Sequence, residues 1–162
     1  MSIHYLFSSN NKIGSKAIAW GSSLYPNHIK NLTNGIPSHV AVLLNNEFVI
    51  ESVLESGVRI VPYKKWREIN KELYKIKEDV PNYELVKDLL LEMWGKKYDW
   101  LGILYFAKCM FCHLVCKSEL PQSNKWESEN RFFCTEFAGR LSGHNYQMTT
   151  PAKMANDLLE RI

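Results

Sequence analysis

Residues 38–77 hold a succession of short apolar stretches, each separated from the next by a few turn-forming residues. In the first of them, Ser38 to Glu51, β-branched and apolar residues flank Asn45-Asn46, which is typical of a β-hairpin. Gly57–Pro62 and Glu72–Lys77 alternate apolar and polar residues as further strands do. The part of the chain between positions 38 and 77 is therefore expected to form most of a sheet.

Helical patterns dominate the rest of the chain. One helix is expected to open at Pro81-Asn82, with Asn82 as its N-cap, and to end at Gly95. The other expected elements are a strand at 3–7, helices at 14–20, 64–71 and 100–116, a helix that begins near Cys134, and a last helix after Thr150-Pro151. Strands first and helices mainly after them predict an α+β fold with an antiparallel sheet packed against helices.

The size and charge of the chain narrow the possible functions. Its 162 residues fit one domain, and no repeat or Gly/Ser linker divides residues 1–162. The net charge is 20 minus 17, or +3, which does not suggest a nucleic-acid-binding face. The N-terminus shows no secretory signal, and the four cysteines are not spaced as a disulfide framework. These features predict a cytoplasmic protein with free thiols, of viral or bacterial origin.

The hairpin brings a histidine and a carboxylate together if its loop has the right length. A three-residue loop at 44–46 would place His39 directly opposite Glu51, with Cβ atoms about 4.5–5.5 Å apart. Val40, Val42, Phe48 and Ile50 would then share the core face. A two-residue loop, Asn45-Asn46, would instead pair His39 with Ser52 and turn Glu51 to the opposite face. The sequence leaves both alternatives open.

Cys134 lies between a polar turn and a helix-competent segment, so it is expected at the start of a helix. The macrodipole and the unpaired amides of a helix N-terminus favour the thiolate form of a cysteine. A cysteine, a histidine and a carboxylate provide a nucleophile, a base and an orienting group for acyl transfer. The amide of Cys134 itself is a candidate donor to the oxyanion of a tetrahedral intermediate.

At these residues the chain resembles the circularly permuted papain-like cysteine hydrolases of the YiiX/YebB type, in the NlpC-related superfamily. Lecithin:retinol acyltransferase-like enzymes are cousins in that group. The resemblance spans residues 36–158 in the same order, apart from the segment 107–130, and rests on an ordered set of pieces rather than on one motif. The pieces are His39, Glu51 about a dozen residues later, Gly57-Val-Arg-Ile, Gly95-Lys-Lys-Tyr-Asp-Trp, Phe133-Cys-Thr-Glu and Thr150-Pro151.

The resemblance implies a permuted papain-like fold and a cysteine peptidase or amidase whose catalytic residues are Cys134, His39 and Glu51. It also implies a peptide, isopeptide or cell-wall amide as substrate, with a lipid ester for hydrolysis or acyl transfer as the alternative. The chemistry needs no cofactor and no metal. A catalytically silent binding module on the same scaffold is a further alternative.

A cysteine cluster in the expected helix at 100–116 permits other interpretations. Cys109, Cys112 and His113 spell a haem-attachment motif, and Cys116 adds a fourth soft ligand. The absence of an export signal argues against haem, and adjacent ligands on one helix point about 100° apart, which argues against structural zinc. We expect a core or protein-interface helix, too short for a membrane span but able to contact a membrane surface.

Several polar residues receive structural interpretations. Tyr98 and Asp99 are expected to form a packing corner between helix and sheet, with a role in lining the site or in stabilising an oxyanion as the alternative. Glu136 is expected to serve as a partner of the helix dipole. His4, His28 and His144 have no identifiable partner and are expected on the surface or in loops.

Overall fold

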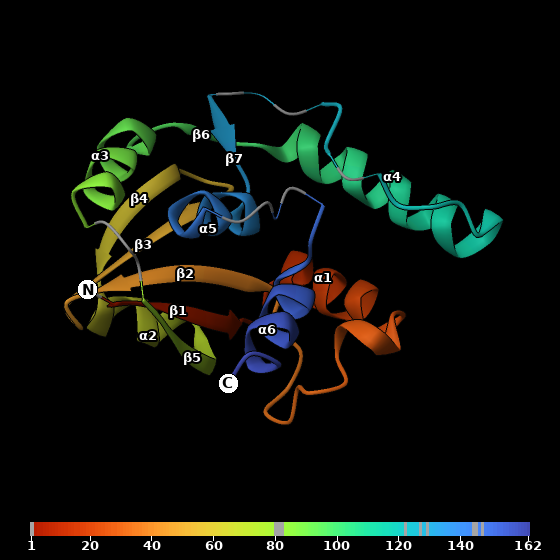
Figure 1. Cartoon of the computed structure of the whole chain (residues 1–162), viewed down its shortest axis with the longest axis horizontal. Coiled ribbons are helices and arrows are strands. Elements are labelled where there is room, and N and C mark those ends of the chain that lie inside the picture. The colour runs from red at the N-terminus through yellow and green to blue at the C-terminus, as the bar shows by residue number, and fades with distance from the viewer. Residues whose placement is uncertain are drawn as a thin grey trace.

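The computed structural model of the protein describes residues 2–79, 83–121, 123–126, 128, 130–143, 146 and 148–162. Its architecture is α+β, with a five-stranded sheet in the order β4-β3-β2-β1-β5 (Figure 1). All neighbouring strands of this sheet are antiparallel. The predicted fold class and the antiparallel sheet are therefore confirmed.

The strands of the main sheet are β1 (Ser2–Ser9), β2 (His39–Leu44), β3 (Phe48–Val53), β4 (Gly57–Pro62) and β5 (Lys71–Asp79). The helices are α1 (Ile13–Ser23), the 3₁₀ turn η1 (Pro26–His28), α2 (Tyr63–Ile69), α3 (Tyr83–Met93), α4 (Trp100–Cys116), α5 (Cys134–Ser142) and α6 (Pro151–Leu159). The two short strands β6 (Lys97–Tyr98) and β7 (Arg131–Phe132) pair in parallel as a separate sheet.

Both faces of the main sheet are buried, because successive residues of each strand point to opposite sides. Val40 and Val42 of β2 pack into the larger core together with Phe137 of α5. Ala41, between them, belongs to a second cluster on the other face, which contains the fully buried Trp66 of α2. Figure 1 shows α5 lying across β2 and β3, the strands that carry His39 and Glu51. This arrangement positions the site.

The β2–β3 hairpin differs from both predicted loops. Asn45 and Asn46 take left-handed φ angles of 52° and 57°, and the Glu47 N–H donates to the Leu44 carbonyl at 3.0 Å. Pairing resumes at Leu44–Phe48, so the three-residue loop is 45–47 rather than 44–46.

The register is thus shifted by two residues from the predicted one. The prediction that His39 lies directly opposite Glu51 was therefore wrong. Because side chains alternate with period two, a shift of two keeps His39 and Glu51 on the same face. Val40, Val42 and Ile50 belong to the core as expected. Phe48, the first residue of β3, is 47% exposed, so its predicted core position was wrong.

The helices that follow the sheet begin largely where the sequence predicted. Helix α4 spans 100–116 as expected, and the Asp99 carboxylate caps it by accepting from the Gly102 N–H at 3.0 Å. Thr150 caps α6 in the same way, with Pro151 in the first turn. The predicted start of α3 at Pro81-Asn82 and the position of His144 lie outside the described residues. The pair β6–β7 was not predicted, since two-residue strands carry no periodic pattern.

None of the helices in the described ranges combines the length and the apolar character that crossing a membrane requires. Helix α4, with 17 residues, is the most apolar of them. Its buried side chains are those of Tyr105 and Met110, whereas many of its apolar residues face outward.

A glycine joins the main sheet to the small one. Gly57 opens β4 with a φ of +67°, and a Cβ at this position would lie 2.0 Å from the Lys96 carbonyl oxygen. That carbonyl accepts from the Val58 N–H at 2.8 Å, and the Val58 carbonyl accepts from the Gly95 N–H at 3.2 Å. Because the two backbones touch here, the position has no room for a side chain.

We expect Gly57→Ala to lower the free energy of unfolding by about 2–4 kcal/mol, from left-handed strain plus the clash with Lys96. Gly95→Ala is the matched control, since Gly95 has a φ of +72° but nothing within 4 Å of its Cβ position. The control should cost about 1–2 kcal/mol. Urea unfolding of both variants measures the difference, and equal midpoints would contradict the close approach of the two segments.

Candidate active site

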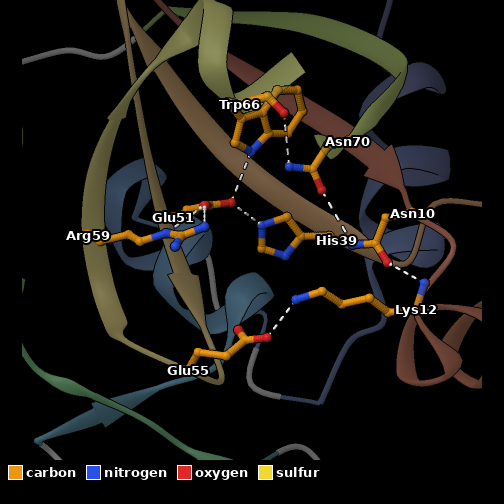
Figure 2. A network of polar contacts seen from close by, with 8 residues as sticks. All are labelled: Asn10, Lys12, His39, Glu51, Glu55, Arg59, Trp66 and Asn70. Atoms are coloured by element: carbon orange, nitrogen blue, oxygen red, sulfur yellow. Dashed lines mark hydrogen bonds and ion pairs between the residues drawn. The ribbon is translucent and has the colours of Figure 1, made fainter. Parts of the chain in front are cut away.

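A single buried carboxylate organises the site. Glu51 of β3 is 1% exposed and receives hydrogen bonds from three elements (Figure 2). His39 Nε2 of β2 lies 2.8 Å from its Oε2, and Trp66 Nε1 of α2 donates to the same oxygen at 2.9 Å. Arg59 of β4 donates to Oε1 through Nε at 2.9 Å and through Nη2 at 2.6 Å. The carboxylate is therefore bonded on both oxygens.

The sheet register explains why these groups meet. Glu51 is directly opposite Arg59 in the β3–β4 ladder, so both side chains project from the same face. His39 is diagonal to Glu51 across the β2–β3 pair, within reach of a side chain as long as glutamate. Trp66 reaches the same face from α2, where it also fills the second hydrophobic cluster.

These contacts hold Glu51 in its charged form. Burial by itself would raise the pKa of the Glu51 carboxyl group, because a charge is poorly solvated in the protein interior. The hydrogen bonds and charges of His39 and Arg59 outweigh burial and lower that pKa to about 2. Glu51 is therefore an ionised, fixed acceptor over the whole physiological pH range.

The imidazole of His39 lies between Glu51 and the sulfur of Cys134. Its Nε2 is bonded to Glu51, which leaves Nδ1 as the ring nitrogen available to the sulfur. Burial would lower the pKa of His39, but hydrogen bonds to Cys134 and Glu51 and the charges of both groups raise it to about 10. The raised pKa favours the imidazolium form of His39.

Cys134 is the first residue of α5, as predicted, and is 5% exposed. The first helical hydrogen bond described in α5 runs from the Phe137 N–H to the Phe133 carbonyl at 3.0 Å. The amides of the first turn, including that of Cys134, have no acceptor within the helix and point toward its N-terminal end. A negative charge that develops beside the sulfur would be stabilised there.

The three predicted residues lie together in the wall of one cavity of about 460 Å³. Cys134, His39 and Glu51 belong to its polar part, and Ser15 and Ser38 also line it, with their hydroxyl groups in contact. The apolar part comes from α1, the β3–β4 turn, α2 and α4, through Ile18, Leu54, Ile69, Trp100, Ile103 and Leu104. The cavity thus combines a reactive end with an apolar wall.

An ion pair joins two walls of this cavity. The Lys12 ammonium, just before α1, lies 2.6 Å from Glu55 Oε1 in the β3–β4 turn. Both side chains line the cavity, and both remain more than half exposed. Figure 2 shows the pair next to His39, with Asn10 and Asn70 bonded to each other on the side toward α2. Exposed pairs of this kind contribute little to stability, so a ligand can displace this one at low cost.

Tyr98 and Asp99 take different positions. Asp99 is the N-cap of α4 and belongs to the packing corner that the sequence predicted. Tyr98 lines the cavity together with Cys134. Burial raises the pKa of the Tyr98 hydroxyl well above its usual value, and the negative charges of Cys134 and Asp99 add to the shift. Tyr98 is therefore a neutral hydroxyl in the wall of the site.

Sequence reasoning missed Arg59 and Trp66 as parts of the site. Arg59 lay within the Gly57-Val-Arg-Ile piece, and a correct β3–β4 register would have placed it opposite Glu51. Trp66 gave no such signal, because its contact with Glu51 depends on where α2 packs. His4 and His28 were expected on the surface or in loops, without a partner. His4 lies within β1 and not in a loop, and the ring of His28 stacks on Tyr25 at 5.0 Å.

The cysteine-rich part of α4 lies apart from this cavity. Cys109, Cys112 and Cys116 are free thiols, and none of them lines the cavity. His113 stacks on Tyr25, with 5.7 Å between the ring centroids. Within the described ranges, no three side chains of the His, Cys, Asp or Glu type gather as they would around a metal ion.

Comparison of the chain with models of protein families, with curated proteins and with solved structures finds no match. The function therefore has to be argued from the geometry of the site, and the permuted papain-like fold remains a prediction.

We expect Trp66→Phe to lower the free energy of unfolding by about 1.5–3 kcal/mol, because Glu51 loses a charge-assisted hydrogen bond while the ring still fills its cluster. Trp94→Phe is the control, since Trp94 is 56% exposed. It should change stability by less than about 0.5 kcal/mol. Thermal unfolding of the two variants makes the comparison, and equal losses would show that the Trp66 N–H is not needed by Glu51.

Proposed function

We propose that the protein is a thiol-dependent hydrolase that cleaves an amide bond through Cys134, His39 and Glu51. The observation that carries the proposal is the placement of His39, which is held by a buried carboxylate and lines the same cavity as a cysteine at a helix N-terminus. Nucleophile, base and orienting group are the parts that covalent acyl transfer requires.

The first half of the reaction forms a thioester. The Cys134 thiolate attacks the carbonyl carbon, and the carbonyl oxygen becomes an oxyanion near the amides of the first turn of α5. His39, as imidazolium, donates its proton to the leaving amine when the C–N bond breaks. The products are the free amine and an acyl group bound to sulfur.

The second half releases the acyl group. His39, now neutral, takes a proton from a water molecule, which attacks the thioester carbonyl. The C–S bond breaks, the acid leaves, and the thiolate and imidazolium are restored. Glu51 stays ionised throughout, and its bonds to Arg59 and Trp66 fix the imidazole so that the second ring nitrogen faces the sulfur.

The proposed substrate class is a peptide, isopeptide or cell-wall amide, and its support is the resemblance to permuted papain-like hydrolases, whose fold we propose for this chain. A lipid ester is a second candidate, favoured by the apolar wall of the cavity. The same three residues would serve either reaction, since both pass through a thioester.

We expect Cys134→Ala to abolish both turnover and labelling by iodoacetamide at mildly acid pH, where ordinary thiols react slowly. Cys116→Ala is the control, because Cys116 is an exposed free thiol on α4. The Cys116→Ala variant should keep both turnover and the labelling of Cys134. Mass spectrometry of labelled peptides identifies the modified residue. Labelling of Cys134 no faster than that of Cys116 would favour a catalytically silent binding module.

The pH dependence tests the role of Glu51. The raised pKa of His39 keeps the imidazolium protonated up to about pH 10. As the pH rises, activity should therefore fall only above about pH 10. Glu51→Gln removes an anion that raises this pKa. We therefore expect the alkaline limb of kcat/KM to move to lower pH by about one unit or more.

The matched control for this experiment is Glu55→Gln. Glu55 also lines the cavity, but its carboxylate pairs with Lys12 and not with His39. It should leave the alkaline limb where it is. An equal shift in both variants would mean that general loss of negative charge, and not the Glu51–His39 contact, sets the profile.

A further inference from the structure

Helix α4 carries a row of exposed apolar side chains that begins at the cavity. We call Trp100, Leu104, Phe111, Leu114 and Val115 the α4 stripe. At about 100° per residue these positions fall within an arc of about 100°, on one side of the helix. Their exposed fractions range from 44% for Leu114 to 66% for Phe111. The row covers about 22 Å of helix, and its first two residues line the cavity that contains Cys134.

The opposite side of α4 is already used by the protein. Tyr105 and Met110 are buried, and the Tyr25 hydroxyl donates to the Met110 carbonyl at 2.8 Å. Asn124 donates to the Gly102 carbonyl at 2.9 Å near the start of the helix. These contacts fix the rotation of α4, so the stripe faces outward as a defined surface. Figure 1 shows α4 extending away from the main sheet.

Helix α4 itself carries basic but no acidic residues. Asp99 and Glu119 lie just beyond its two ends, and Glu55 at the cavity is paired with Lys12. Residues 100–118 contain Lys108 and Lys117 but no aspartate or glutamate. The first 46 residues, which include the α1 wall of the cavity, also contain no acidic residue. Such a surface is complementary to anionic lipid headgroups, which attract lysines beside an inserted apolar face. It suits a second copy of the chain poorly, because a two-fold pairing about the middle of the stripe would bring the Lys108 side chains of both copies together.

The positions of the tryptophans also favour a lipid surface as the partner. Four of the five tryptophans are 48% exposed or more, and two of these, Trp100 and Trp126, lie on or beside α4. Trp126 packs against Tyr105 at 5.3 Å between ring centroids, with the Lys108 ammonium 5.9 Å from its ring. Tryptophan and lysine together are typical of the membrane–water interface, where an amphipathic ring lies at headgroup depth.

We propose that the α4 stripe docks onto the surface of an anionic lipid membrane, with α4 lying in the plane of the interface. Docking places the mouth of the Cys134 cavity against the bilayer, since Trp100 and Leu104 belong to both surfaces. The substrate is then a membrane-anchored molecule. This last step rests on the proposed hydrolase function, whereas the docking itself does not.

The test is flotation of the full chain with vesicles of phosphatidylcholine containing about one third phosphatidylserine, with pure phosphatidylcholine vesicles for comparison. The wild-type chain should float with the anionic vesicles and much less with the neutral ones. Binding should weaken as salt rises, because the headgroup attraction is screened. The Cys134→Ala variant should bind equally well, which separates docking from the proposed chemistry.

Phe111→Glu is the decisive variant, and Leu91→Glu is its matched control. Both wild-type side chains are 66% exposed on helices, but Leu91 lies on α3 and outside the stripe. We expect the affinity of Phe111→Glu for vesicles to fall by roughly tenfold or more, and that of Leu91→Glu to stay unchanged. Thermal unfolding confirms that both variants are folded.

Three results would overturn the proposal. They are absence of wild-type flotation, equal loss in the two variants, and a wild-type dimer that Phe111→Glu dissociates without any lipid binding. The last result, measured by sedimentation velocity, would assign the stripe to a second copy of the chain.

Discussion

The structure depends on the burial of one charge. The Glu51 carboxylate has been removed from water, which is costly for an ion unless several donors replace the solvent. Arg59, Trp66 and His39 supply those donors from a strand, a helix and a second strand. If one of the three moves, the charge loses part of its compensation. The interaction therefore ties β2, β3, β4 and α2 to one relative arrangement, and it fixes the orientation of the imidazole at the same time.

The rest of the fold brings the nucleophile to this fixed imidazole. Helix α5 packs on the face of the sheet opposite Trp66. Its first residue, Cys134, lines the cavity at the N-terminal end of β2, where His39 lies. The β6–β7 pair sets the approach to that helix, because Phe132 of β7 precedes Cys134 by two residues. Because Gly57 has no side chain, the start of β4 can contact the backbone of Lys96 and Lys97 at the start of β6. Each of these contacts restricts where the sulfur can lie.

The sequence predicted the parts of the fold that have a local signal. Helix α4, the capped start of α6 and the helix start at Cys134 follow from periodicity and from residue types at helix ends. The shared face of His39 and Glu51 followed from counting along one of the two hairpin loops that the sequence left open, the three-residue loop. The count itself was wrong by two residues, because the left-handed turn at Asn45 and Asn46 is followed by one further loop residue. Because side chains alternate with period two, an error of two residues still places His39 and Glu51 on the same face of the sheet.

Other features had no local signal. Trp66 joins Glu51 only because α2 folds back over the sheet, and β6 pairs with β7 across more than thirty residues of sequence. The outward direction of the α4 stripe is set by Tyr25, which lies 85 positions before its hydrogen-bond partner Met110. Long-range contacts of this kind depend on the packing of the whole chain, which a residue pattern does not contain.

The central claim is that His39 is an imidazolium, stabilised by the Glu51 carboxylate and by its interaction with Cys134. Its most direct test is a titration of the ¹⁵N-labelled imidazole of His39 by NMR in the wild-type chain and in Cys134→Ala. In the wild-type chain the ring should stay protonated up to about pH 10, and in the variant it should lose its proton at a distinctly lower pH. A wild-type His39 that titrates near the ordinary value of about 6.5, or one that Cys134→Ala leaves unchanged, would contradict the account.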